Sequence, residues 1–91
     1  MIQITAISMQ NGAGHQNVTG VMWKSTATCE AIASTEAIVI WLAATSNNRA
    51  VVIDDGQEIA VDVVTDDGRE PYLRTRENGA WTDHLLDLPR F

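Results

Sequence analysis

Two pairs of turn residues, Asp55-Gly56 and Asn78-Gly79, constrain the fold of this chain more than any other feature of its sequence. Asp-Gly and Asn-Gly favour two-residue type I′ turns, because both central positions of that turn need a positive φ angle. Apolar, β-branched and aromatic residues flank both pairs, and such residues are typical of strands. The sequence therefore predicts two antiparallel hairpins, at residues 49–64 and 72–85.

The hairpin at residues 49–64 has one entirely apolar face in the register that its turn specifies. Successive side chains of a strand point to opposite faces, so every second position lies on the same side. The apolar face consists of Ala50, Val52, Ile59, Val61 and Val63, and we expect it to lie in the core. The opposite face carries Glu58 and a predicted ion pair between Arg49 and Asp62.

The hairpin at residues 72–85 gathers aromatic and charged side chains on one face. We expect Arg76 to lie opposite Trp81, where a cation–π contact can form. Arg74 is expected opposite Asp83 as an ion pair. In the same register Tyr72 meets Leu85. The predicted face therefore consists of Tyr72, Arg74, Arg76, Trp81, Asp83 and Leu85, with Leu73, Thr75 and Thr82 on the other side.

This aromatic and basic face is the best candidate for binding. Tryptophan, tyrosine and arginine supply most of the binding energy at protein interfaces. The candidate binding residues are Tyr72, Arg74, Arg76, Trp81, Asp83 and Trp23. The alternative is a cross-strand ladder that only stabilises the sheet, because such pairs are common between neighbouring strands.

The remainder of the chain predicts further strands and one helix. A strand at residues 2–9 alternates at first, although Ile7 and Met9 fall on its polar face. Val21 and Trp23 share one face of the next strand, which returns antiparallel to the first. The other expected elements are a loop at residues 10–17, strands at 18–24 and 31–33, turns at 25–30 and 65–70, and a last turn that places Leu85, Leu86 and Leu88 on the core.

A helix near residues 35–45 is favoured by its capping signals. Ser34 or Thr35 can accept a hydrogen bond from the first turn, and an asparagine of residues 46–48 can end the helix in the left-handed conformation. The alternative is a buried strand, because residues 38–40 are all β-branched.

Together these elements predict a single α+β domain that spans residues 1–91. Its sheet is antiparallel and has five or six strands, and it either stays open or curls into a barrel. A chain of 91 residues is long enough to bury one core.

Composition argues against several classes of partner. The formal net charge is −6, with Lys24 as the only lysine, whereas duplex nucleic acid and anionic membranes both require a basic surface. Cys29 is the only cysteine, so no internal disulfide can form. The first residues lack the features of a signal peptide, and the longest apolar run, residues 37–44, is too short to span a bilayer. We expect a cytoplasmic protein.

The sequence assigns no catalytic or metal-binding role. His15, His84 and Cys29 have no second ligand at the spacings typical of zinc sites. Neighbouring residues of a strand point to opposite faces, so Asp83 and His84 cannot form a dyad there. A strand and not a helix follows the loop at residues 12–15, so the loop lacks the usual support for a phosphate. We therefore expect no metal, no cofactor and no enzymatic activity.

A non-enzymatic binding or interaction module of unknown partner is the function that these observations favour. The alternative is a protein that binds or sequesters a small ligand or nucleotide between Trp23, Trp81 and Arg74. An enzyme would need His15 or His84 beside a serine, a threonine or Cys29.

Homo-oligomerisation, most simply a dimer, is also expected, because residues 37–44 are apolar on every side of the helix. Ile7, Met9, Met22, Val51, Ile53 and Val64 also fall on faces that the alternation assigns to solvent.

Segments along nearly the whole chain carry residues that recur in one known family. These are Ile2, Ile4, Ala6 and Ile7, then Gly12-Ala13-Gly14-His15, Val21-x-Trp23, Ile40-Trp41-Leu42, Tyr72-Leu73-Arg74-Thr75 and Thr82-Asp83-His84-Leu85-Leu86-x-Leu88-Pro89. The chain thereby resembles the small bacterial and phage proteins called domain of unknown function 3892. The ending is the most specific part, and His84 departs from the asparagine usual there. The resemblance implies a small standalone domain, and no catalytic residue, substrate or cofactor.

Overall fold

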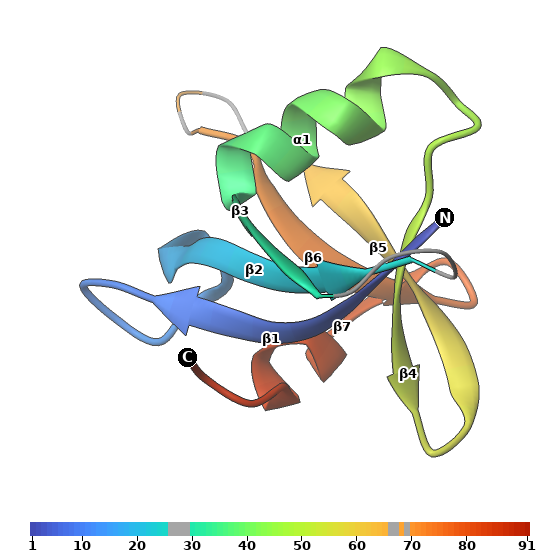
Figure 1. The fold of residues 1–91 in the computed structure, drawn as a ribbon. Helices are drawn as coiled ribbons and strands as arrows, with labels where there is room; N and C mark the ends of the chain where they lie inside the picture. The colour runs from blue at the N-terminus through green and yellow to red at the C-terminus, as the bar shows by residue number, and fades with distance from the viewer. Residues whose placement is uncertain (26–29, 66–67, 69) are drawn as a thin grey trace.

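The computed structural model describes residues 1–25, 30–65, 68 and 70–91. These residues form one sheet, one α-helix and two short 3-10 helices (Figure 1). The strands are β1 (Ile2–Met9), β2 (Val18–Lys24), β3 (Ala31–Ser34), β4 (Ala50–Asp54), β5 (Gln57–Val64), β6 (Tyr72–Glu77) and β7 (Ala80–Thr82). The helix is α1 (Thr35–Ala44), and the 3-10 helices are η1 (His15–Asn17) and η2 (His84–Asp87).

The sheet is mixed, with the strand order β3-β2-β1-β4-β5-β6-β7. The α+β class is confirmed. The prediction of five or six strands, all antiparallel, is wrong, because the described residues form seven and β1 runs parallel to β4 through Ile2 and Ala50. Parallel neighbours need a crossover connection, and β2, β3 and α1 supply it here. The barrel alternative is also wrong, since the sheet is open and ends in β3 and β7.

Both predicted type I′ turns are confirmed. Asp55 and Gly56 have φ angles of 51° and 80°, and Asn78 and Gly79 have φ angles of 53° and 82°. The first turn pairs β4 with β5 in the expected register, and four members of its apolar face are buried: Ala50, Val52, Ile59 and Val61. The predicted Arg49–Asp62 pair is wrong: Asp62 lies beside Arg76 across the β5–β6 ladder, and Arg49 precedes β4.

The second hairpin is shorter than predicted. The ladder between β6 and β7 includes the expected Arg76–Trp81 pair but ends at Thr82. The predicted Tyr72–Leu85 pair is wrong, because the chain turns into η2 and Tyr72 pairs with Val64 of β5. Leu85 is fully buried, so core burial replaces the last rungs of the hairpin. The predicted last turn onto the core is confirmed, with Leu86 and Leu88 packed against it.

A bulge in β1 explains why Ile7 does not face solvent. The register of β1 on β2 shifts by one residue between Ile4 and Ala6. A bulge of this kind reverses the alternation of side chains beyond it. Ile7 therefore pairs with Val21 on the core side, and both residues are fully buried. Hydrogen bonds of Ile7 to residues 89 and 91 cover the other edge of β1 at this point.

Helix α1 begins as predicted, and the strand alternative for residues 38–40 is wrong. The Ser34 side chain accepts a hydrogen bond from the Ala37 backbone N–H at 3.1 Å. The predicted left-handed asparagine is wrong, because none of residues 46–48 has a positive φ angle. Asn48 instead donates its side-chain amide to the Trp41 carbonyl oxygen, at 2.7 Å, and satisfies one free carbonyl of the last turn.

The core lies between α1, η2 and the strands, with Ile38 as the buried hydrophobic residue of α1 and Leu85 as that of η2. None of the described helices is long and apolar enough to cross a membrane. Cys29, most of the predicted turn at residues 25–30 and most of the Asp67-Gly68 turn lie outside the described residues.

Candidate functional site

Six side chains form a row across the face of the sheet that points away from the core. Each occupies the ladder position opposite the next, so that they follow β2, β1, β4, β5, β6 and β7 in turn. Residues paired across strands point to the same face of a sheet. The row, called the cross-sheet row below, consists of Lys24, Gln3, Val51, Ala60, Arg76 and Trp81.

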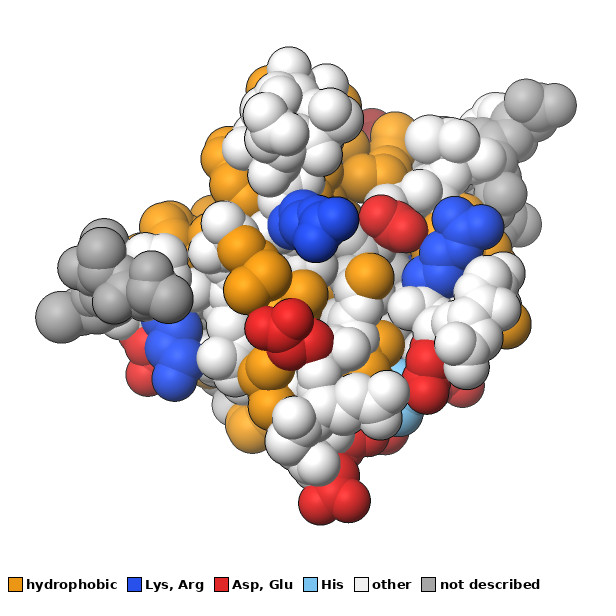
Figure 2. Space-filling view, turned by 90° about the vertical axis from the view of Figure 1, so that its right-hand side faces the viewer, with side chains coloured by type: hydrophobic (Ala, Val, Ile, Leu, Met, Phe, Trp, Pro, Cys, Tyr) orange, Lys and Arg blue, Asp and Glu red, His pale blue; other side chains and the backbone are white. Residues whose placement is uncertain are grey.

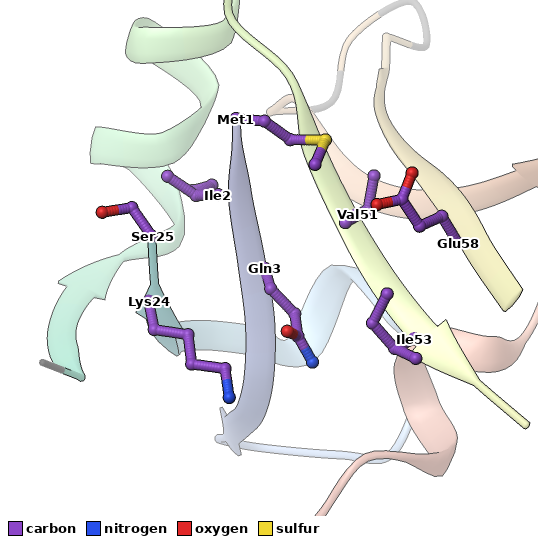
Figure 3. Close-up of a pocket in the computed structure, with 8 residues that line it drawn as sticks. All are labelled: Met1, Ile2, Gln3, Lys24, Ser25, Val51, Ile53 and Glu58. Atoms are coloured by element: carbon purple, nitrogen blue, oxygen red, sulfur yellow. The ribbon is translucent and has the colours of Figure 1, made fainter. Parts of the chain in front are cut away.

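A shallow depression of about 360 Å³ lies in the middle of this face. Its apolar lining includes Met1, Val51 and Ile53 (Figure 3). Lys24 and Glu58 reach it from opposite sides, one from β2 and the other from β5. In the space-filling view, hydrophobic side chains gather in the middle of this side of the molecule, with acidic and basic groups around them (Figure 2). The depression thus combines an apolar floor with charges of both signs.

The predicted contact between Arg76 and Trp81 is confirmed at one end of the row. The guanidinium carbon lies 5.2 Å from the centre of the indole ring. Trp81 keeps 40% of its surface exposed, so this contact stabilises the fold by no more than about 1 kcal/mol. Arg76 also approaches Asp62, but at 3.8 Å between two half-exposed groups this pair adds little. Arg76 and Trp81 therefore each keep a substantial part of their surface accessible to a partner.

The predicted Arg74–Asp83 pair is confirmed as well, and the structure adds His15 to it. Arg74 Nη2 lies 3.0 Å from Asp83 Oδ1, and Arg74 Nε donates to the Thr82 carbonyl oxygen at 3.2 Å. His15 Nε2, which comes from η1, lies 3.5 Å from the same Asp83 oxygen. Sequence reasoning missed this contact, because the two residues are far apart in the chain and no local pattern links them.

The surroundings of His15 favour its neutral form. Burial lowers the pKa of His15 below its ordinary value, and the positive charge of Arg74 lowers it further, whereas Asp83 acts in the opposite direction. The His15 side chain keeps only 11% of its surface exposed. Its Nε2 atom is buried and has no hydrogen-bond partner among the described residues.

His84 connects the tips of two hairpins. Its Nδ1 lies 2.8 Å from Asp54 of β4, and its Nε2 lies 3.2 Å from Glu77 of β6. The two carboxylates sit on opposite ring nitrogens, so the three groups do not converge on one point. Within the described ranges no group of three or more His, Cys, Asp or Glu residues could hold a metal ion. The partners of His84 are thus Asp54 and Glu77 and not its neighbour Asp83.

Tyr72 and Trp23 lie apart from the rest of the predicted site. Tyr72 is half-buried in a wide open groove that residues 16–19 and α1 also line. Trp23 pairs with Ile4 on the core side of the sheet and packs against the core. Trp23 and Trp81 therefore lie on opposite faces of the sheet and cannot enclose one ligand.

The fold defines a small α+β domain with one open, mixed sheet. The model of a family described as "Protein of unknown function (DUF3892)" matches residues 3–89 of the chain. The protein therefore belongs to the DUF3892 family, as the resemblance indicated. No curated protein and no solved structure matches the chain.

Proposed function

We propose that the protein is a non-enzymatic interaction module and that the cross-sheet row is its contact surface. The observation that carries this proposal is the position of the exposed Arg76–Trp81 pair on the same face as the apolar depression. Aromatic and arginine anchors around an apolar centre, with polar groups at the rim, are typical of protein interfaces.

The charges around the depression favour a protein partner. Lys24 and Glu58 flank the depression and form no ion pair with any described residue. Charges of both signs at an interface select the orientation of a partner that carries the complementary pattern. The net charge of −6 disfavours a polyanion such as duplex nucleic acid as the partner.

A shallow site also fits a protein better than a small ligand. Small-molecule sites are concave and bury most of the ligand surface. The depression is open, and Trp23 lies on the other face of the sheet, away from Trp81. The row therefore fits a protein surface, and a ligand held between Trp23, Trp81 and Arg74 does not fit this arrangement.

Affinity capture from an extract of the native host tests the proposal. Wild-type protein and the double variant Ile53→Ala/Trp81→Ala are immobilised in equal amounts, and bound proteins are quantified by mass spectrometry. Ile40→Ala is the matched control, because Ile40 is an exposed isoleucine of α1, away from the row. We expect the double variant to lose at least one protein that wild type and control retain. Equal capture by all three forms would refute the assignment of the row.

A further inference from the structure

Strand β3 leaves one edge of the sheet open. It pairs with β2 through four residues, from Ala31 opposite Trp23 to Ser34 opposite Gly20, and no described residue pairs with its other side. Native proteins usually protect such an edge with a lysine, a proline, a bulge or a covering segment. The sequence of β3 is Ala-Ile-Ala-Ser, so it contains no charge and no proline. Among the described residues this edge has no ladder partner, so its backbone groups can pair with another strand.

Exposed apolar side chains accompany this edge. Ile32, in the middle of β3, keeps 67% of its surface exposed. Helix α1 continues directly from β3 (Figure 1), and Ile40 on its outer surface keeps 63% exposed. Three alanines of the helix are exposed with Ile40, namely Ala37, Ala43 and Ala44. Ile32 pairs with Met22 on the face of the sheet away from the core, whereas α1 covers the core face, so exposed apolar groups flank the β3 edge on both sides. The strip formed by β3 and the outer surface of α1 is therefore mostly apolar, with Glu36 as its one charged residue.

The low charge of this strip matters because the protein carries a net charge of −6. Two copies of such a chain repel each other over most of their surfaces. Residues 31–44 contain one ionisable side chain, that of Glu36, which is exposed in the first turn of α1. Of the acids that flank the strip, Glu30 is bound back to the Thr5 hydroxyl at 2.8 Å. Two copies meet with least repulsion where their β3–α1 strips face each other.

We infer that two copies of the chain associate through their β3 edges as an antiparallel pair around a two-fold axis. An open antiparallel edge is complementary to itself, so the second copy satisfies its hydrogen bonds without any other partner. In a pairing centred on Ile32, this residue faces Ile32 of the second copy, and Glu30 faces Ser34. No two acids then lie opposite each other, and the two sheets become one.

The helices must contribute to this interface. A stable dimer buries roughly 800 Å² on each partner, which is about one seventh of the 5653 Å² that the described chain exposes. A four-residue edge alone buries less, so the exposed surface around Ile40 has to pack against the second copy. Small interfaces of this kind give weak association, and we expect a dissociation constant on the order of 100 micromolar.

Sedimentation equilibrium across a concentration series tests the inference. We expect the average mass of the wild type to rise from 9.9 kDa at low micromolar concentration towards twice that value at several hundred micromolar. Ile32→Lys should remain at the monomer mass throughout, because it places two like charges opposite each other at the axis. Ile53→Lys is the matched control: it adds the same charge at an exposed isoleucine of β4, away from β3, and should dimerise as the wild type does.

A wild type that stays at 9.9 kDa at every concentration overturns the inference. Dimerisation of Ile32→Lys to the wild-type extent also overturns it, as does equal dissociation of Ile53→Lys, which would place the interface elsewhere. Circular dichroism checks that each variant is folded. If Ile32→Lys does not fold, Ile40→Lys supplies the same test from α1. The row variant Trp81→Ala should dimerise normally, so this inference and the proposed function can fail independently.

Discussion

The position of Leu85 gives the sharpest test of the fold, because alternation along the chain and the structure assign it to different environments. In a longer hairpin Leu85 would pair with Tyr72 on the exposed face. In the structure η2 turns its side chain into the core, where none of its surface is exposed. Leu85→Ala distinguishes the two positions by its cost in stability.

The expected cost follows from the burial of Leu85. Each buried methylene contributes about 0.8 kcal/mol, so the carbon atoms removed account for roughly 2.4 kcal/mol. A cavity left in a packed core adds to this, and buried Leu→Ala changes typically cost about 2–5 kcal/mol. We expect about 3 kcal/mol, which lowers the melting temperature of a domain of this size by roughly 12–24 °C.

Urea unfolding followed by circular dichroism measures the difference in free energy. Leu86→Ala is the matched control, because Leu86 lies next in the chain, in the same 3-10 helix, and is only partly buried. The control should cost about 1 kcal/mol. A cost below about 1 kcal/mol for Leu85→Ala would refute the placement of this residue in the core, since an exposed leucine contributes no more than that.

Four further predictions follow. His15 has a lowered pKa in the folded protein, so its contribution to stability is full above its unfolded pKa and falls as the pH drops below about 6.5. The free energy of unfolding of the wild type, relative to that of His15→Gln, should therefore be smaller at pH 5 than at pH 8 when both are measured by urea unfolding. An equal difference at the two pH values would contradict this. His84→Ala removes the contacts with Asp54 and Glu77, and we expect a loss of about 1 kcal/mol and faster amide exchange at both hairpin tips. Trp81→Ala and Arg74→Ala should each cost only about 1 kcal/mol, because both side chains are partly exposed; unfolding of Arg74→Ala would show that this arginine is structural. A chelator should leave the melting temperature of purified protein unchanged, and a shift of several degrees would reveal a metal site.

Local features of the sequence were enough to predict the hairpins and the start of the helix. The turns at Asp55-Gly56 and Asn78-Gly79 need positive φ angles that few residues tolerate, and each turn sets the register of the rungs beside it. The same reasoning located the Arg76–Trp81 contact and the Ser34 cap, because their partners lie close in the chain. The same reasoning failed for the predicted Tyr72–Leu85 pair, a few residues from the turn, because burial of the leucines of η2 outweighed continuation of the hairpin.

The sequence by itself thus determined the elements whose partners are near in the chain, with their turns, caps and local pairings. Only the tertiary structure decided that β1 lies beside β4, that a bulge turns Ile7 inward, and that His15 meets Asp83. It also placed Lys24 and Trp81 at the two ends of one row. The physical reason is that short-range steric preferences act on neighbouring residues alone. Contacts between distant segments depend on the order of the strands, which is selected by the burial of the whole core.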